Sequence, residues 1–276
     1  MHINLFLAEA LPLIESTLDT LLPREEGVFG SARYSLFTPG KRLRPLLALA
    51  TATSYGISLS RVLIPACALE LIHTYSLIHD DLPCMDNDDF RRGKPSLHKV
   101  VPEWQALLTG DYLLTYAFEL LSTFPDLSCT EKLELIQILS KAAGAEGMIG
   151  GQMLDLLSEG KTLSWETLEQ MHKQKTAQLI VASLEFGAIF GKAPPKDRAL
   201  LKQIGNEIGL AFQLIDDLLD GTSDKNKATS LTLLGSALTE KKADELLASV
   251  DRCLAQLSCD PSLLKSLCHS MVKRTK

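Results

Sequence analysis

Apolar residues recur at three- and four-residue spacing through most of this chain. Such spacing places them on one face of a helix, whereas a half-buried strand alternates apolar and polar positions. The pattern predicts helices over residues 3–22, 43–56, 61–82, 103–123, 131–157, 165–190, 197–220 and 240–257. Alternating, strand-like stretches are absent from the sequence, so we expect an all-α fold.

Short segments rich in proline, glycine and polar residues separate the predicted helices. They are Thr38-Pro39-Gly40, Arg92-Gly93-Lys94-Pro95, Phe124-Pro125-Asp126, Ser158-Glu159-Gly160 and Ala193-Pro194-Pro195. The sequence contains no linker, low-complexity tract or fixed-period repeat. We therefore predict a single domain over residues 1–276, built as a bundle of roughly ten or more helices.

Two clusters of aspartates interrupt the apolar helical pattern. The first contains Asp80, Asp81 and Asp86, and the second contains Asp216, Asp217 and Asp220. Carboxylates in apolar surroundings are unfavourable unless they are protonated, paired or bound to metal. Hard cations such as Mg²⁺ prefer oxygen ligands and often bind together with a substrate phosphate. The clusters indicate a metal-assisted phosphate site, although either one alone could be a solvated acidic face.

The spacing of the second cluster predicts a shared helical face. Asp216, Asp217 and Asp220 fall within about 100° of arc on an ideal helix. Gln213 lies one turn earlier and joins that face.

The first cluster has a different geometry because Pro83 cannot continue a regular helix. Asp80 and Asp81 are therefore expected to close a helix, with Asp86 returning from the following turn. His73 precedes Asp80 by two helical turns and should share its face.

Basic residues are clustered as well. They occur in Gly40-Lys41-Arg42-Leu43-Arg44-Pro45, in Arg91-Arg92-Gly93-Lys94, at Lys173 and Lys175, and at Lys225 and Lys227. Arginine binds phosphate through two parallel hydrogen bonds, and lysine acts as a point charge. Carboxylates with metal on one side and these cations on the other would suit two diphosphates bound face to face. Ordinary surface charge is the alternative for any one cluster.

The charge and the cysteine content of the chain limit which partners and which cellular compartment we expect for it. The formal net charge of -6 disfavours non-specific binding to nucleic acid or anionic membranes. The six cysteines form no Cys-x-x-Cys pair and are typical of reduced thiols in a cytoplasmic protein. The N-terminal residues lack the basic segment of a signal peptide. No apolar run reaches the ~20 residues that span a bilayer, so stable membrane insertion is not expected.

In its motifs the chain resembles the short-chain trans-isoprenyl diphosphate synthase family, especially its bacterial farnesyl diphosphate synthase (geranyltranstransferase) branch. The matching stretches are Gly40 to Pro45, His73 to Pro95, Gly110-Asp111, Gly150-Gly151-Gln152 with Asp155, Lys175-Thr176, and Phe212 to Asp220. The resemblance implies an isoprenoid synthase fold, all-α around a central cavity, and usually a homodimer. It implies head-to-tail condensation of isopentenyl diphosphate with allylic diphosphates (dimethylallyl, geranyl). The implied cofactor is Mg²⁺, three ions in the family pattern, with Mn²⁺ as the alternative.

The resemblance also assigns roles to individual residues. Implied metal ligands are Asp80, Asp86, Asp216 and Asp220, and Asp81, Asp217 and Lys175 complete the implied catalytic set. Isopentenyl diphosphate would bind at Lys41, Arg44, His73 and Arg92, next to Gly40. The allylic diphosphate would bind at Arg91, Lys175, Thr176, Gln213 and Lys227.

The sequence also carries a prediction for the chain length of the prenyl product. Tyr75 lies five residues before Asp80, about 7.5 Å deeper along a helix, and Ser76 beside it is small. In the family, an aromatic residue at that position acts as a floor for the growing chain. The resemblance therefore implies farnesyl diphosphate as the main product, with geranylgeranyl diphosphate as the alternative. Tyr75 could also be an ordinary core aromatic.

The chain departs from the family after Asp220. The usual loop is longer and ends in Lys-x-Thr-Tyr-Pro, whereas this chain runs through Lys227-Ala228-Thr229-Ser230-Leu231. Two other classes of function remain open from the residues. One is a non-catalytic partner subunit with the same fold, although such proteins typically lose an aspartate cluster. The other is a metal phosphohydrolase that uses His73 with His79-Asp80.

Overall fold

A computed structural model describes residues 2–221, apart from the side chain of Asp220, and residues 228–273. Its α-helices are α1 (Ile3–Leu21), α2 (Val28–Leu36), α3 (Leu43–Ser54), α4 (Leu63–Asp80), α5 (Leu97–Val100), α6 (Glu103–Thr123), α7 (Cys129–Ala143), α8 (Met148–Leu157), α9 (Trp165–His172), α10 (Gln178–Phe190), α11 (Pro195–Asp220), α12 (Ser230–Leu234), α13 (Ser236–Leu254) and α14 (Ser262–Val272). A 3₁₀ turn, η1 (Leu59–Arg61), precedes α4, and a π-helical segment, η2 (Lys173–Ala177), joins α9 to α10. The prediction of an all-α fold is confirmed.

Extended structure in the described residues is a single small hairpin. Strand β1 (Phe90–Arg91) pairs antiparallel with β2 (Lys94–Pro95), and Arg91 lies opposite Lys94. Arg92 and Gly93 form the turn with left-handed φ angles of 52° and 77°. Glycine adopts such angles without strain. This hairpin was not expected, because two-residue strands carry no alternating pattern.

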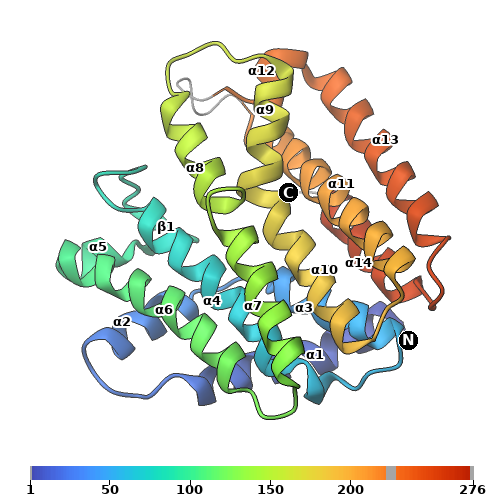
Figure 1. The fold of residues 1–276 in the computed structure, drawn as a ribbon. Coiled ribbons are helices and arrows are strands. Elements are labelled where there is room, and N and C mark those ends of the chain that lie inside the picture. Colours follow the sequence, from blue (N-terminus) through green and yellow to red (C-terminus); the bar gives the residue numbers. More distant parts are fainter. Residues whose placement is uncertain (1, 222–227, 274–276) are drawn as a thin grey trace.

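Helices α4 and α10 form the centre of the bundle. Every residue of α10 from Leu179 to Phe190 is buried, and α4 packs against α3 and α6. Figure 1 shows α4 and α10 crossing the interior, with α11 and α13 side by side on one flank. One connected cluster of buried apolar side chains runs from Phe6 in α1 to Val272 in α14. This core fixes the helix ends that surround the site.

The expected helix over 131–157 is two helices. Helix α7 ends at Ala143 and α8 begins at Met148, with Gly144 and Gly147 in the turn between them. A Cβ atom at Gly147 would lie 2.0 Å from the carbonyl oxygen of Ala142, so a larger residue does not fit there. Gly151 allows a second close contact, because a Cβ atom there would lie 2.3 Å from the backbone nitrogen of Lys175. The small residues of this region thus both interrupt the helix and let α8 pack closely against η2.

Local signals explain other helix ends. The Ser164 hydroxyl caps α9 by accepting a hydrogen bond from Thr167 N, as its position before the helix predicts. Helix α11 starts with Pro195 in its first turn, where the missing N–H has no intrahelical partner to lose. None of the described helices combines the length and hydropathy required to cross a bilayer.

Candidate active site

A cavity of about 1260 Å³ opens between the ends of α4, α8, η2 and α11 and the loop before α3. It is lined by most of the predicted site residues: Gly40, Lys41, Arg44, His73, Tyr75, Ser76, Asp80, Asp86, Arg91, Arg92, Lys175, Thr176, Gln213 and Asp216. Asp81 and Asp217 do not line it. The side chain of Asp220 and the whole of Lys227 lie outside the described residues. Segments far apart in sequence thus bring carboxylates and cations to one cavity.

The first aspartate cluster closes α4 in the way Pro83 predicts. Asp80 is the last residue of the helix, and the backbone N–H of Asp86 donates to the Asp80 carbonyl oxygen at 2.9 Å. Burial raises the pKa of Asp80 to about 6; Lys175 opposes this rise, and the negative charge of Asp86 adds to it. The positive charges of the protein therefore do not fully offset the burial of the ionised Asp80 carboxylate. A cation bound in the cavity would stabilise that charge.

Asp81 points away from the cavity and holds Arg91. Its Oδ1 atom accepts a hydrogen bond from Arg91 Nε at 2.9 Å and a second, shorter one from Nη2. Asp88 also contacts Arg91, at 3.1 Å. Because Asp81 is buried, it fixes the direction of a guanidinium group that itself lines the cavity.

Histidine and arginine meet on the other side of the first cluster. Arg92 Nη2 lies 3.4 Å from His73 Nε2. Burial, together with the charges of Arg44 and Arg92, holds the pKa of His73 well below its ordinary value. The neutral imidazole can thus accept a hydrogen bond from Arg92. Gly40 makes room for this arrangement, since a Cβ atom there would lie 2.4 Å from Arg92 Nη1.

Arg42 is not singled out as a site residue by the sequence pattern. It has a left-handed φ of 49° and is only 4% exposed. Its guanidinium donates to Glu15 at 2.7 Å, to Glu70 at 3.0 Å and to the Leu36 carbonyl oxygen at 2.7 Å. Arg42 therefore anchors the entry into α3, between Lys41 of the preceding loop and Arg44 of the first helical turn. In the sequence Arg42 is one of several cations in a basic motif, and only the fold reveals its buried partners.

Arg44 is a partly buried cation that lines the cavity. Burial lowers its pKa to about 10; Glu70 opposes this change, and Arg92 contributes to it. An anion entering the cavity beside Arg44 would offset the burial of its charge.

The segment η2 carries two predicted binding residues into the cavity. Lys175 Nζ lies 2.7 Å from Asp155 Oδ2 of α8, and Thr176 Oγ1 donates to Gln213 Oε1 at 3.1 Å. Both Lys175 and Thr176 line the cavity although they are consecutive. A π-helical turn is a frequent feature of functional sites, because it reorients side chains within a helix.

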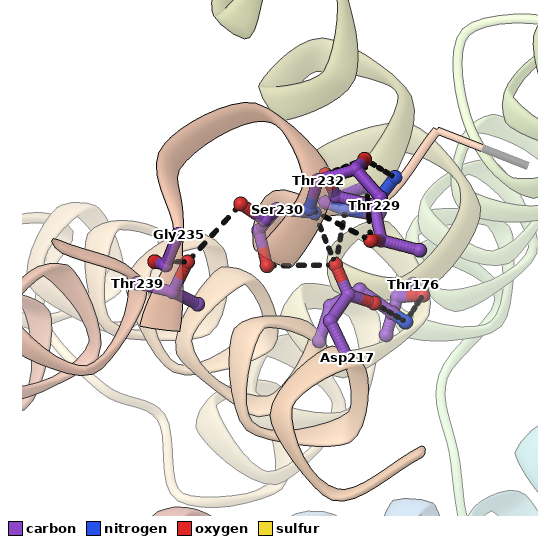
Figure 2. A network of polar contacts seen from close by, with 9 residues as sticks. Thr176, Asp217, Thr229, Ser230, Thr232, Gly235 and Thr239 are labelled. Atoms are coloured by element: carbon purple, nitrogen blue, oxygen red, sulfur yellow. Dashed lines mark hydrogen bonds and ion pairs between the residues drawn. The ribbon is translucent and has the colours of Figure 1, made fainter. Parts of the chain in front are cut away.

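The two adjacent aspartates of the second cluster, Asp216 and Asp217, point in different directions. Asp216 lines the cavity, whereas Asp217 is 7% exposed and faces α12. Oδ2 of Asp217 accepts hydrogen bonds from Ser230 N at 2.7 Å and Ser230 Oγ at 2.8 Å (Figure 2). Burial acts to raise the pKa of Asp217, but His172 and Ser230 outweigh it and hold the pKa below its usual value. Adjacent residues differ by about 100° around a helix, so the two aspartates cannot share one direction.

The carboxylates fit a hard divalent cation. Asp80 at the end of α4, Asp86 in the following turn and Asp216 in α11 bring carboxylates to one cavity. Within the described residues, no three or more acidic, histidine or cysteine side chains are gathered closely enough to hold a metal by themselves. Mg²⁺ commonly takes one or two carboxylates together with substrate phosphate oxygens. The donor set suits a cation that binds together with a diphosphate.

The apolar part of the cavity lies deeper along α4. Tyr75 is 4% exposed, and its hydroxyl has no hydrogen-bond partner among the described residues. Its ring meets that of His79 edge to face, with centroids 5.7 Å apart. His79 also lines the cavity and contacts the Leu107 carbonyl oxygen at 3.0 Å. The sequence gave no indication that His79 packs against Tyr75.

Comparisons with known proteins agree with this geometry. The sequence profile of the polyprenyl synthetase family matches residues 26–242. A farnesyl diphosphate synthase from Geobacillus stearothermophilus is 41% identical, over 99% of this chain and 98% of that protein. A geranylgeranyl diphosphate synthase from Cyanophora paradoxa is 43% identical, over 80% of this chain and 75% of that protein. The apo crystal structure of a FPP/GFPP synthase from Zymomonas mobilis has a TM-score of 0.92 and 38% identity, covering 98% of this chain and 99% of that one.

Proposed function

This chain belongs to the polyprenyl synthetase family, and we propose that it condenses isopentenyl diphosphate head to tail with dimethylallyl and geranyl diphosphate. Farnesyl diphosphate is the main product. The observation that carries the proposal is one cavity that is lined by carboxylates, several cations and apolar side chains, with Tyr75 among them. Near-full-length similarity to farnesyl diphosphate synthases supports the same activity.

The cations of the cavity would bind two diphosphates. Lys41, Arg44 and Arg92, with His73 beside them, receive isopentenyl diphosphate. Arg91, Lys175, Thr176 and Gln213 receive the allylic diphosphate, and Lys227 is assigned to the same group from the sequence. Charge-assisted hydrogen bonds of this kind are about twice as strong as neutral ones, and they hold the reacting carbons close together.

The reaction begins when the C1–O bond of the allylic substrate breaks and diphosphate leaves with the electron pair. Mg²⁺ ions held by Asp80, Asp86 and Asp216, with Asp220 assigned from the sequence, would offset the charge that develops on the diphosphate. Arg91 and Lys175 stabilise the same charge as preorganised cations. The isopentenyl double bond then attacks the allylic carbon, and loss of a proton, taken up by the released diphosphate, forms the new double bond.

The apolar wall protects the cationic carbon from water. Met153, Leu156 and Leu157 of α8 line the cavity together with Leu114 of α6. Excluding water prevents capture of the cation by hydrolysis. The same wall would receive the growing prenyl chain, down to the ring of Tyr75.

We further propose a homodimer and a cytoplasmic location. Trp104 and Leu108 of α6 are 64% and 52% exposed, and Val100 of α5 is 51% exposed. Neighbouring exposed apolar residues of this kind mark protein contact surfaces. The six cysteines are free thiols, which fits a reducing compartment. Light scattering after size exclusion would test the dimer, and a monomeric mass would contradict it.

The test of the activity uses labelled isopentenyl diphosphate with dimethylallyl, geranyl or farnesyl diphosphate and Mg²⁺. We expect C15 product from the first two substrates and little extension of the third. Predominant C20 product would favour the geranylgeranyl alternative, which the similarity to the Cyanophora paradoxa enzyme supports. No turnover without a partner protein would favour a non-catalytic subunit. Release of inorganic phosphate without prenyl product would indicate a phosphohydrolase.

A further inference from the structure

Ser230 is fully buried at the start of α12 and binds a single acceptor twice. Its backbone N–H and its hydroxyl both donate to Oδ2 of Asp217, at 2.7 and 2.8 Å. His172 Nε2 of α9 faces the same oxygen at 3.6 Å. The contacts of Oδ2 are thus provided by α12 and α9, and Oδ1 remains for a partner on the cavity side.

That partner is Gln213, which lines the cavity. Its Nε2 atom donates to Oδ1 of Asp217 at 3.3 Å, and its Oε1 atom accepts from the Thr176 hydroxyl at 3.1 Å. An ionised carboxylate can only accept hydrogen bonds. Asp217 therefore selects the amide orientation in which the nitrogen of Gln213 faces it. In that orientation one N–H of the amide bonds to Asp217, and the second remains as a donor.

Ser230 is itself held from the side away from the cavity. Its carbonyl oxygen accepts from the Thr239 hydroxyl of α13 at 3.1 Å. Thr229 and Thr232 form a reciprocal capping box at the start of α12, with N···Oγ1 distances of 3.0 and 3.2 Å. Figure 2 shows this continuous network from Thr239 through Ser230 and Asp217 toward Thr176.

We propose that Ser230 is a positioning residue for the allylic diphosphate: by holding Asp217, it orients the Gln213 amide so that its free N–H is available to the diphosphate. The inference rests on the proposed function, in which Gln213 is an allylic contact. It concerns the position at which the related family usually carries tyrosine. A tyrosine hydroxyl lies at the far end of a ring and cannot make the short contact that Ser230 Oγ makes with Asp217. The hydroxyl of Ser230 thus supplies a hydrogen bond to Asp217 that a tyrosine at this position would not supply.

The experiment compares Ser230→Ala with Thr232→Ala in the full-length, Mg²⁺-loaded protein. Ser230→Ala removes the hydroxyl bond to Asp217, whereas Thr232→Ala weakens the α12 cap without touching Asp217. Calorimetric titration with geranyl diphosphate alone measures allylic binding without turnover, and steady-state kinetics measures KM for isopentenyl diphosphate. We expect Ser230→Ala to weaken geranyl diphosphate binding about five-fold and to change the isopentenyl diphosphate KM less than two-fold. Thr232→Ala should leave both values near wild type.

A double-mutant cycle separates positioning from general damage. If Ser230 acts through the Gln213 amide, Ser230→Ala should have little further effect on geranyl diphosphate binding in a Gln213→Ala background. Additive losses would overturn the inference, and so would equal weakening of both substrates. Unchanged binding in Ser230→Ala, with an active wild-type enzyme, would overturn the inference and leave the proposed function intact. A wild-type protein that turns over neither substrate would overturn both.

Discussion

Nη1 of Arg42 lies 3.0 Å from Oε1 of Glu70, and both side chains are at most 3% exposed. The guanidinium also reaches Glu15, whose side chain is 43% exposed. Arg42, the residue between Lys41 and the start of α3, thus joins α4 to α1. A buried charge that keeps its partners is tolerated, and one that loses a partner is strongly unfavourable.

We therefore predict that Glu70→Gln destabilises the protein by about 3 kcal/mol. The matched variant Glu15→Gln removes a solvent-screened partner of the same arginine and should cost no more than about 1 kcal/mol. Urea unfolding monitored by circular dichroism gives both values. Equal losses in the two variants would show that burial of Glu70 does not control the interaction.

Asp80 supplies a prediction for the metal-free protein. Its folded-state pKa, about 6, is above the ordinary value of 3.8 because burial disfavours the charged form. A raised pKa gives a stabilising contribution that is present below about pH 4 and is lost as the pH rises through about 6. In EDTA, Asp80→Asn should be more stable than wild type at pH 8, by up to about 3 kcal/mol, and nearly equal to it at pH 4. Urea unfolding at the two pH values checks this, and a wild type that exceeds the variant at pH 8 would contradict it.

Substitution of the proposed metal ligands should lower turnover, although at Asp80 it should raise the stability of the metal-free protein at pH 8. Asp80→Asn and Asp216→Asn each remove a proposed metal ligand, so kcat/KM with Mg²⁺ should fall by much more than ten-fold, a loss above about 1.4 kcal/mol. Retention of a tenth or more of wild-type kcat/KM by either folded variant would remove that residue from the proposed metal site. Circular dichroism confirms that the variants are folded.

The sequence predicted those helices whose periodicity is long and clearly interrupted. Helix α6 was predicted over 103–123 and is observed over Glu103–Thr123. Helix α14 was missed although six of its 11 residues are apolar and recur at helical spacing, because the segment is short and follows directly on the turn at Pro261. The segment η2 was also missed, since a π-helical turn leaves the apolar pattern almost unchanged and depends on packing against Gly151.

The sequence identified candidate site residues more readily than it predicted where their side chains point. The sequence placed Asp216 and Asp217 on one face, but Asp217 turns to Ser230, thirteen residues further along the chain. Arg42 and Asp81 show the same limit: each lies in a charged motif, and each serves a neighbouring charged group. Helices and loops that are distant in the sequence decide which member of a motif contacts the substrate. The local spacing of residues contains no information about those distant segments.

The two proposed diphosphate sites can be separated by substitution. Lys41→Ala and Arg44→Ala should chiefly raise the KM for isopentenyl diphosphate, and Arg91→Ala and Lys175→Ala should chiefly raise the KM for geranyl diphosphate. Each lost charge-assisted contact is worth roughly 1.5–3 kcal/mol. Lys175→Ala also releases Asp155, 2.7 Å away, so its effect should be at the upper end. The same change for both substrates in all four variants would rule out the two-site assignment.

The final prediction concerns product length and uses the ring of Tyr75. The ring is buried at the cavity wall and is backed by His79, whose position requires Gly110: a Cβ atom there would lie 2.1 Å from His79 Nε2. Because the Tyr75 hydroxyl has no partner among the described residues, Tyr75→Phe should keep the C15 product. Tyr75→Ala removes the ring, opens space along α4, and should yield C20 or longer products. Chromatography of labelled products distinguishes the variants. An unchanged C15 distribution in Tyr75→Ala would show that Tyr75 is an ordinary core aromatic, and longer products from Tyr75→Phe would show that the hydroxyl, and not the ring, limits the chain.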